Sequence, residues 1–138
     1  MTAAASARRT WYLDSSVALY ILLAQSEHAA RWFDERAEAG DDLVSSQLLV
    51  LEIVRALRRE SLDVALGHEF VDELTLLGVD NALIGEAAAI RPHVRSLDAL
   101  HLASVQRLGA GSATVVTHDA TMARVADGLG FDVYDPIV

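Results

Sequence analysis

The sequence predicts an α/β fold in which a short parallel sheet is covered by helices on both faces. Short β-prone segments alternate with longer segments of helical apolar spacing, and this order is typical of parallel sheets. Hydrophobic residues make up 52% of the 138 positions, so one sizeable core can form. No linker or repeat interrupts the chain. We therefore expect a flexible tail at residues 1–10 and a single domain at residues 11–138.

The first half of the chain begins with a β-prone segment at residues 11–13 that ends at Asp14. Ser15 and Ser16 are natural N-caps for the apolar helix that follows, and Ser46 has the same place before a later helix. We expect strands at 11–13 and 43–45, and helices at 17–23, 26–39 and 47–60.

The second half contains one long region of helical spacing and the clearest strand. Apolar residues recur at helical intervals from Leu62 to Leu77, which predicts one helix over residues 61–77. Residues 114–117 are β-branched throughout and predict a strand. The remaining elements are expected as helices at 83–90, 97–108 and 119–129, and as a last strand at 131–133.

Composition limits the kinds of site that the chain can hold. The absence of cysteine excludes disulfides, thiolate metal sites and cysteine nucleophiles. No apolar run approaches the roughly 20 residues of a membrane helix, and the N-terminal segment lacks the apolar stretch of a signal peptide, so we expect a soluble cytoplasmic protein with no membrane partner. The formal net charge of −9 argues against an electrostatic grip on nucleic acid, unless the acids hold divalent cations that reverse the local charge.

Three of the acids that stand out have an ordinary structural explanation. Asp14 and Asp119 lie at strand-to-helix turns, and Asp98 lies in the first turn of an expected helix. At such positions a carboxylate caps the helix or complements its dipole. Taken singly, none of the three requires a function.

Glu52 is harder to explain by structure alone. On a helix it shares a face with Leu48, Leu49 and Ala56, and a carboxylate on an apolar face is costly unless something pairs with it. Arg55, three residues further on, is one candidate partner. A metal-centred cluster is the other.

Considered together, the four acids favour a metal site. Oxygen ligands select hard cations, Mg²⁺ or Mn²⁺, rather than zinc. A cation held by a few carboxylates keeps several waters, activates one as a nucleophile and neutralises charge on a phosphate. Without a metal, the same carboxylates would raise one another's pKa values at a cost in stability.

The order and context of these acids resemble the PIN-domain nucleases, and within them the VapC-type toxins of bacterial toxin–antitoxin pairs. The resemblance extends roughly from Trp11 to Pro136, and its most diagnostic part is Asp-Ala-Leu-His-Leu-Ala-Ser at residues 98–104. The matching segments are 12–16, 51–57, 96–104 and 116–119.

The resemblance implies a PIN-like three-layer sandwich and a ribonuclease that hydrolyses phosphodiester bonds with Mg²⁺ or Mn²⁺. It also implies a cognate antitoxin as the inhibitor, and many relatives form homodimers, which the apolar helices here would support. The implied catalytic and metal-binding residues are Asp14, Glu52, Asp98 and Asp119, with Ser15 and Thr117 helping to position a ligand or the attacking water.

Basic residues and histidines complete the candidates. Arg91 and Arg95 precede Asp98 and are expected either to contact the RNA backbone or to lie in a solvated loop. His101 follows Asp98 by about one helical turn, so we expect a hydrogen bond between them, or a packing role, rather than metal ligation.

Two other functions remain open from the sequence. An aspartyl-phosphate phosphatase would use Asp14 as its nucleophile, although the second Asp that such motifs carry two residues later is Ser16 here. A non-catalytic metal- or partner-binding module would use the acids only as helix caps.

Overall fold

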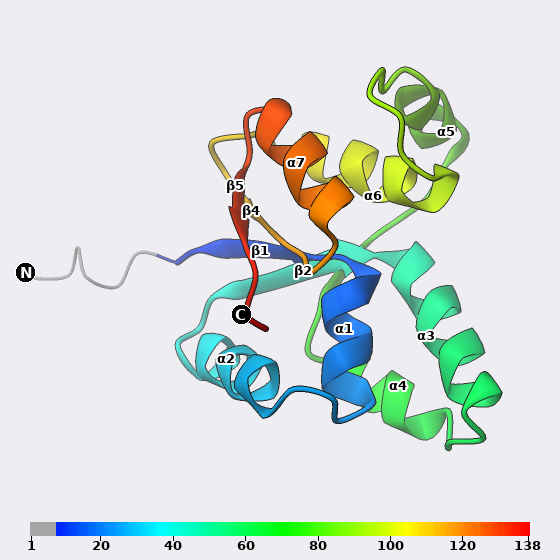
Figure 1. Cartoon of the computed structure of the whole chain (residues 1–138), viewed down its shortest axis with the longest axis vertical. Helices are drawn as coiled ribbons and strands as arrows, with labels where there is room; N and C mark the ends of the chain where they lie inside the picture. The colour runs from blue at the N-terminus through cyan, green and yellow to red at the C-terminus, as the bar shows by residue number, and fades with distance from the viewer. Residues whose placement is uncertain (1–7) are drawn as a thin grey trace, which may run out of the picture.

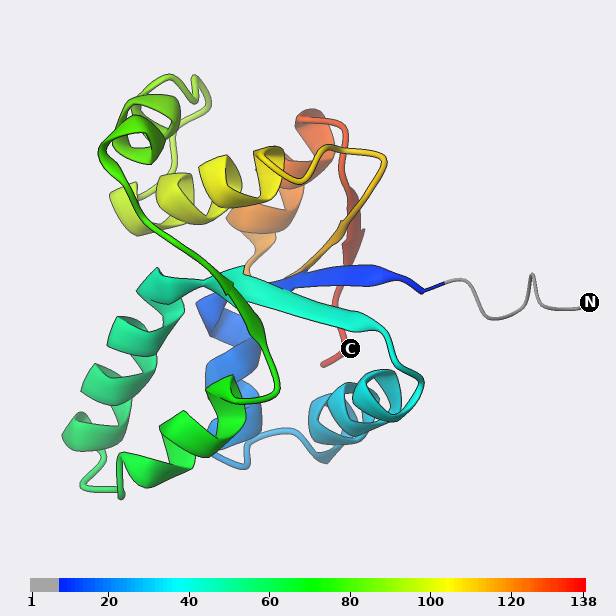
Figure 2. The same cartoon turned by 180° about the vertical axis from the view of Figure 1, so that it is seen from behind.

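A computed structural model describes residues 8–138 and contains a five-stranded parallel sheet between two layers of helices (Figure 1). Helices α1–α4 lie on one side of the sheet and α5–α7 on the other, which the reverse view also shows (Figure 2). The predicted α/β class with a parallel sheet is confirmed. Residues 1–7 of the expected tail lie outside the described residues, and the first strand begins at Thr10.

The strand order across the sheet is β3-β2-β1-β4-β5. The chain moves outward from the central β1 through β2 to β3, and then crosses back to the other side of β1 for β4 and β5. The direction of winding therefore reverses between β1 and β4, which is where open parallel sheets bind their ligands. The strands are β1 (Thr10–Leu13), β2 (Asp42–Ser46), β3 (Thr75–Leu77), β4 (Thr114–Val116) and β5 (Asp132–Tyr134).

Seven helices connect these strands in the described part of the chain. None of them, within residues 8–138, is long and apolar enough to cross a membrane. The helices are α1 (Ser15–Leu22), α2 (Glu27–Glu38), α3 (Gln47–Arg59), α4 (Ala65–Val71), α5 (Asn81–Ala88), α6 (Ser96–Gln106) and α7 (Ala120–Gly128).

The helix predicted over residues 61–77 is wrong at both ends. Ser61 adopts a left-handed backbone conformation (φ 57°) directly after α3, and α4 covers only the middle of the region. The last three residues form β3, in which Leu76 pairs with Ser45 of β2. Helical spacing was the only local signal, and pairing with a distant strand overrode it.

The central strand sends alternate side chains to the two layers, as the period of a strand requires. Trp11 and Leu13 pack into the core formed with α1–α4, whereas Tyr12 packs into the core formed with α6 and α7. Tyr12 and Leu13 are both fully buried. This alternation aims the Tyr12 hydroxyl at α6 and leaves Asp14 at the carboxyl end of the strand.

Candidate active site

The carboxyl ends of β1 and β4 meet at the point where the winding reverses. Leu13 pairs with Val116, and the backbone N–H of Asp14 donates to the Val116 carbonyl at 3.1 Å. Asp14 therefore follows one strand beside Thr117, which follows the other. The topology brings together two predicted site residues that are more than 100 positions apart in the sequence.

Asp14 is buried and accepts hydrogen bonds on both carboxylate oxygens. Its Oδ1 accepts from the backbone N–H (3.1 Å) and the hydroxyl (2.6 Å) of Ser16, and its Oδ2 accepts from the Thr117 hydroxyl (2.5 Å). Burial raises the pKa of Asp14, and the hydrogen bonds from Ser16 and Thr117 partly oppose the shift. The residue also caps α1, the role that we had expected from Ser15 or Ser16.

Two hydroxyl side chains connect Asp14 to the turn after β4. Thr117 Oγ1 donates to Asp14 and accepts from the backbone N–H of Asp119 (3.1 Å). Ser16 Oγ donates to Asp14 and accepts from the backbone N–H of His118 (3.0 Å). Thr117 and Ser16 therefore hold Asp14 against the turn after β4. The ligand- or water-positioning role expected of Ser15 and Thr117 stays a prediction, and Ser15 lines the hollow beside Glu52. The capping pattern was the sequence signal for Ser16, and it did not show that the Ser16 hydroxyl contacts Asp14.

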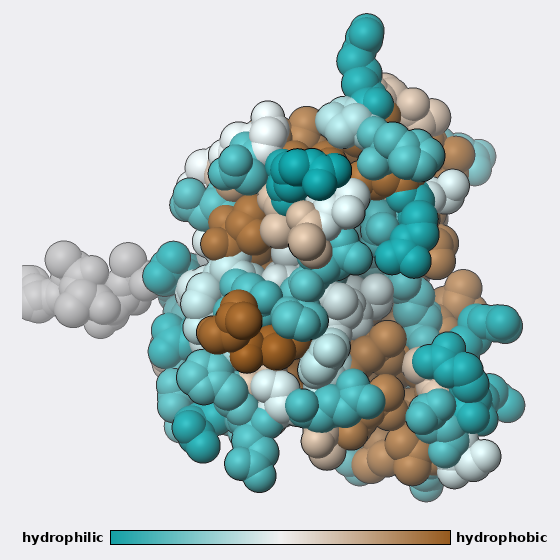
Figure 3. Space-filling model, viewed as in Figure 1, coloured by the Kyte–Doolittle hydropathy of each residue, from teal (hydrophilic) through white to brown (hydrophobic). Residues whose placement is uncertain are grey.

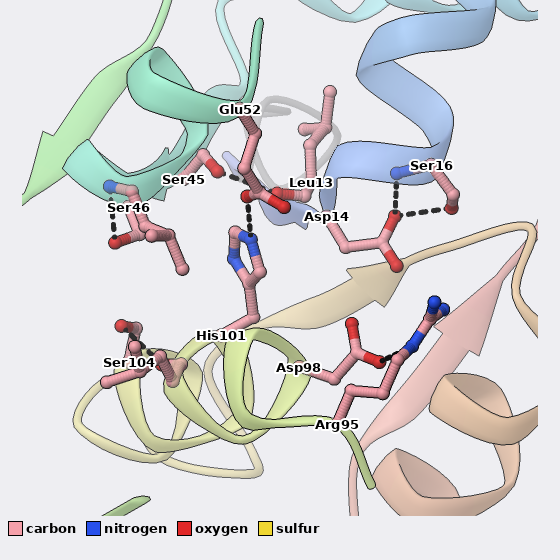
Figure 4. Close-up of polar contacts among 12 residues, drawn as sticks. Leu13, Asp14, Ser16, Ser45, Ser46, Glu52, Arg95, Asp98, His101 and Ser104 are labelled. Atoms are coloured by element: carbon pink, nitrogen blue, oxygen red, sulfur yellow. Dashed lines mark hydrogen bonds and ion pairs between the residues drawn. The ribbon is translucent and has the colours of Figure 1, made fainter. Parts of the chain in front are cut away.

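Glu52 lies on α3 with most of its side chain covered, at 17% exposure. Its Oε1 lies 2.8 Å from Nε2 of His101 on α6 (Figure 4). Arg55, the partner that we considered from the sequence, is exposed. The predicted hydrogen bond between Asp98 and His101 is also absent from the contacts of the described residues. The imidazole instead connects α6 to α3, a pairing that sequence spacing within one helix could not reveal.

Asp98 and Asp119 lie near each other and share one cation. Arg95 Nε lies 3.4 Å from Asp98 Oδ2, and Arg95 Nη2 lies 3.7 Å from Asp119 Oδ2. Burial raises the pKa of Asp98; Arg95 opposes this shift, and the negative charge of Asp119 adds to it. Asp119 also caps α7 by accepting from the Met122 backbone N–H at 2.8 Å. The Arg95 side chain is 81% exposed, so its ion pairs are solvent-screened contacts.

Three of the acids face one common space. In Figure 4, Glu52 reaches down from α3, Asp98 reaches up from α6, and Asp14 enters from the start of α1. Two hollows, of about 250 and 290 Å³, lie beside each other here. Arg95 and Asp98 line both hollows. Glu52 and Ser15 line the first, and Asp119 lines the second. Glu52, Asp98 and Asp119 therefore line two adjoining hollows that meet at Arg95 and Asp98, and Asp14 points toward the same region from the carboxyl end of β1; together these form the acidic pocket.

A larger cavity lies elsewhere in the molecule. It has a volume of about 430 Å³, is formed by α5, the loop before α6 and α6 itself, and contains none of the four acids. Arg91 lies at this cavity rather than in the acidic pocket. Of the two arginines proposed to contact RNA, only Arg95 therefore borders the acids.

The donor set of the pocket fits a hard divalent cation. All four predicted ligands are carboxylates, and the two whose pKa values are raised, Asp14 and Asp98, would be relieved by positive charge. Within residues 8–138, no three acidic or histidine side chains close around a single point. Such an open arrangement suits Mg²⁺, which commonly uses one or two carboxylates and retains several waters.

Comparison with protein families and curated proteins gives consistent matches over most of the chain. The PIN domain family matches residues 11–128. Ribonuclease VapC46 of Mycobacterium tuberculosis (strain ATCC 25618 / H37Rv) is 36% identical over 130 residues, which cover 91% of this chain and 96% of that protein. Ribonuclease VapC35 of the same strain is 32% identical over 131 residues, with the same coverage.

Solved structures share the fold at lower sequence identity. DNA-bound VapBC from Salmonella typhimurium superposes with a TM-score of 0.71 at 17% identity, over 93% of this chain and 98% of the matched chain. FitAB bound to an IR36 DNA fragment superposes with a TM-score of 0.70 at 20% identity, over 93% and 96% of the two chains. These likenesses agree with the three-layer architecture described above.

Proposed function

The chain belongs to the PIN domain family, and we propose that its acidic pocket hydrolyses RNA phosphodiester bonds with Mg²⁺ or Mn²⁺, as the toxin of a type II toxin–antitoxin pair. The observation that carries this proposal is the common space faced by Glu52, Asp98 and Asp14 at the reversal point of the sheet (Figure 4). The similarity to ribonucleases VapC46 and VapC35 supports a nuclease over an aspartyl-phosphate phosphatase or a non-catalytic module.

Four carboxylates would hold the cation: Asp14, Glu52, Asp98 and Asp119. When bound, a divalent cation supplies an activated water at neutral pH and neutralises the charge that develops on the phosphate. Thr117 and Ser16 keep Asp14 in one orientation through the hydrogen bonds that its oxygens accept. The carboxylate is therefore fixed before a ligand arrives, which reduces the reorganisation that binding requires.

Arg95 is the cation best placed to meet the RNA backbone. Its guanidinium borders both hollows of the pocket and is mostly exposed, so it can contact a phosphate beside the acids. Arg91 lies further along the same loop and would contact RNA outside the pocket. In a chain of net charge −9, these contacts position the polyanion only near a loaded metal site.

Removal of divalent cations tests the proposed activity. We expect the purified chain to cleave a labelled RNA in Mg²⁺ or Mn²⁺, to lose this cleavage completely in excess EDTA and to regain it when the metal is restored. An equal rate in EDTA would exclude the proposed chemistry. Absence of cleavage on any RNA in either metal, together with absence of Mn²⁺ binding, would favour the non-catalytic module.

A cognate antitoxin is the proposed protein partner. The VapBC and FitAB neighbours were solved as complexes, and this chain presents apolar surface beside α1, α3 and α4 (Figure 3). Leu62 and Leu66, just before and within α4, are 41% and 43% exposed, and a basic partner would also complement the acidic pocket. A second copy of the chain is the alternative occupant of this apolar surface.

We expect an equimolar amount of a small basic protein encoded beside this chain to abolish RNA cleavage. Light scattering of the chain alone, and of the mixture, distinguishes a homodimer from a toxin–antitoxin complex. Unchanged cleavage in the presence of the bound neighbour would contradict its role as an antitoxin.

A further inference from the structure

A chain of three side chains connects the core to the candidate metal site. Tyr12 Oη on β1 lies 2.8 Å from Nδ1 of His101 on α6, and His101 Nε2 lies 2.8 Å from Glu52 Oε1 on α3. Tyr12 and His101 are fully buried, whereas Glu52 reaches the pocket. Both nitrogens of a buried imidazole thus have a partner, and one of these partners is a proposed metal ligand.

The partners determine which ring nitrogen carries the proton. An ionised Glu52 carboxylate can only accept, so Nε2 must donate to it. In a neutral ring Nδ1 is then an acceptor, and it takes the hydrogen bond from the Tyr12 hydroxyl. Neither nearby serine donates to Nδ1, because Ser45 donates to the Leu13 carbonyl and Ser104 donates to the Leu100 carbonyl.

The hydrogen bond from His101 fixes one oxygen of Glu52 and leaves the other available. Oε1 is the oxygen held by Nε2, while the other carboxylate oxygen points toward Asp14 in Figure 4. His101 also lies one helical turn after Asp98, so one helix supplies an acid of the pocket and the group that holds another acid. Because α3 and α6 lie on opposite sides of the sheet, this bond also connects the two helical layers beside the pocket (Figure 1).

We propose that His101 is a positioning residue that orients Glu52 for divalent-cation binding, and that Tyr12 supports the imidazole by donating to Nδ1. This inference rests on the proposed metal-dependent function. It assigns no contact between His101 and either the metal or the RNA. Groups that orient the ligands of a metal typically change its affinity by about 10-fold to 100-fold when removed.

Three variants test this role through metal binding measured by calorimetry. His101→Leu fills a similar volume without a donor, and we expect it to weaken Mn²⁺ binding by about 10-fold to 100-fold. His101→Gln retains an N–H donor near the position of Nε2 and should recover much of the affinity. Tyr12→Phe keeps the imidazole and its donation to Glu52 but removes the hydrogen bond at Nδ1, so it should weaken Mn²⁺ binding less than His101→Leu does. Melting temperatures in EDTA report whether each variant is folded.

Nuclear magnetic resonance of the imidazole nitrogens provides a test without metal. The wild-type protein in EDTA should show His101 as the Nε2–H tautomer, and Tyr12→Phe should keep this tautomer, because Glu52 still accepts from Nε2. An Nδ1–H tautomer in wild type, or unchanged Mn²⁺ affinity in folded His101→Leu, would overturn the positioning role. Failure of wild type both to bind Mn²⁺ and to cleave RNA would instead overturn the proposed function.

Discussion

Asp98→Asn is expected to reduce RNA hydrolysis by about 100-fold or more while leaving the chain folded. The side chain keeps its size, and Asp98 caps no helix, because α6 begins after Arg95 without a side-chain cap. The lost charge, however, is one that the pocket needs to hold a cation. Burial and the neighbouring Asp119 already disfavour the ionised form of Asp98, so the metal-free variant should melt at or above the temperature of wild type near neutral pH. Rate constants and melting curves in EDTA measure the two effects.

Asp98 is a better position for this test than Asp14. The Asp14 carboxylate caps α1 and accepts hydrogen bonds from Ser16 and Thr117, so its replacement would mix loss of the site with loss of the cap. Arg95→Gln is the matched control, because it removes the ion-pair partner of Asp98 and keeps the acid. We expect this control to raise the KM for RNA while Mn²⁺ affinity is kept or improved. Full activity in Asp98→Asn would exclude this acid from the site.

The second large effect is a steep rise of the hydrolysis rate with pH on the acidic side. Burial raises the pKa of both Asp14 and Asp98 above the ordinary value of 3.8. Each carboxyl that must lose a proton before it can bind a cation lowers the rate about tenfold per pH unit below its pKa. Two such groups together give up to about 100-fold per unit. The rising, acidic limb of the pH–rate profile should therefore extend to pH values above the range in which an ordinary aspartate titrates.

The hydrolysis rate should rise with pH, whereas the contribution of Asp14 and Asp98 to the stability of the metal-free protein should fall as the pH rises. A raised pKa means that the folded chain binds the proton more tightly than the unfolded chain does. Their contribution to the free energy of unfolding is therefore present at low pH and is lost as the pH rises from 3.8 through the folded-state values. Asp41, Asp80 and Glu86 have lowered pKa values and contribute with the opposite sign.

The rise in melting temperature caused by Mn²⁺ isolates the site, because groups outside the pocket contribute equally with and without metal. This rise should grow as the pH increases above the ordinary value of 3.8, over the range in which Asp14 and Asp98 lose their protons. A rise that is constant over this range, or larger at acidic pH, would contradict the assignment of these acids to metal binding.

Local sequence signals predicted most of the fold. Capping serines such as Ser26 and Ser46 lie at the helix starts that the sequence indicated, and the first three residues of the β-branched segment at 114–117 form β4. The strand at Thr75–Leu77 could not be found in this way. Its residues continue a helical pattern, and only the edge of β2, about 30 positions earlier, makes them a strand.

The candidate site was predictable in its acids and not in the groups that orient them. Asp14 and Asp119 follow strands and Glu52 interrupts an apolar helix face, so each departs from a local pattern. His101 does not depart from a local pattern, because a histidine on a buried helix face is explained by packing alone. Its contact with Glu52 depends on how α3 and α6 pass each other at the edge of the sheet, which is a property of the assembled fold.

We propose that a divalent cation held by these acids is what makes the chain a ribonuclease. The most direct measurement titrates Mn²⁺ into the EDTA-stripped, dialysed protein and records site occupancy by calorimetry and cleavage of one labelled RNA at the same metal concentrations. We predict that the cleavage rate follows occupancy from zero to saturation, and that Asp98→Asn loses both. Cleavage at full rate before the site is occupied, or binding that saturates without any cleavage, would contradict the claim.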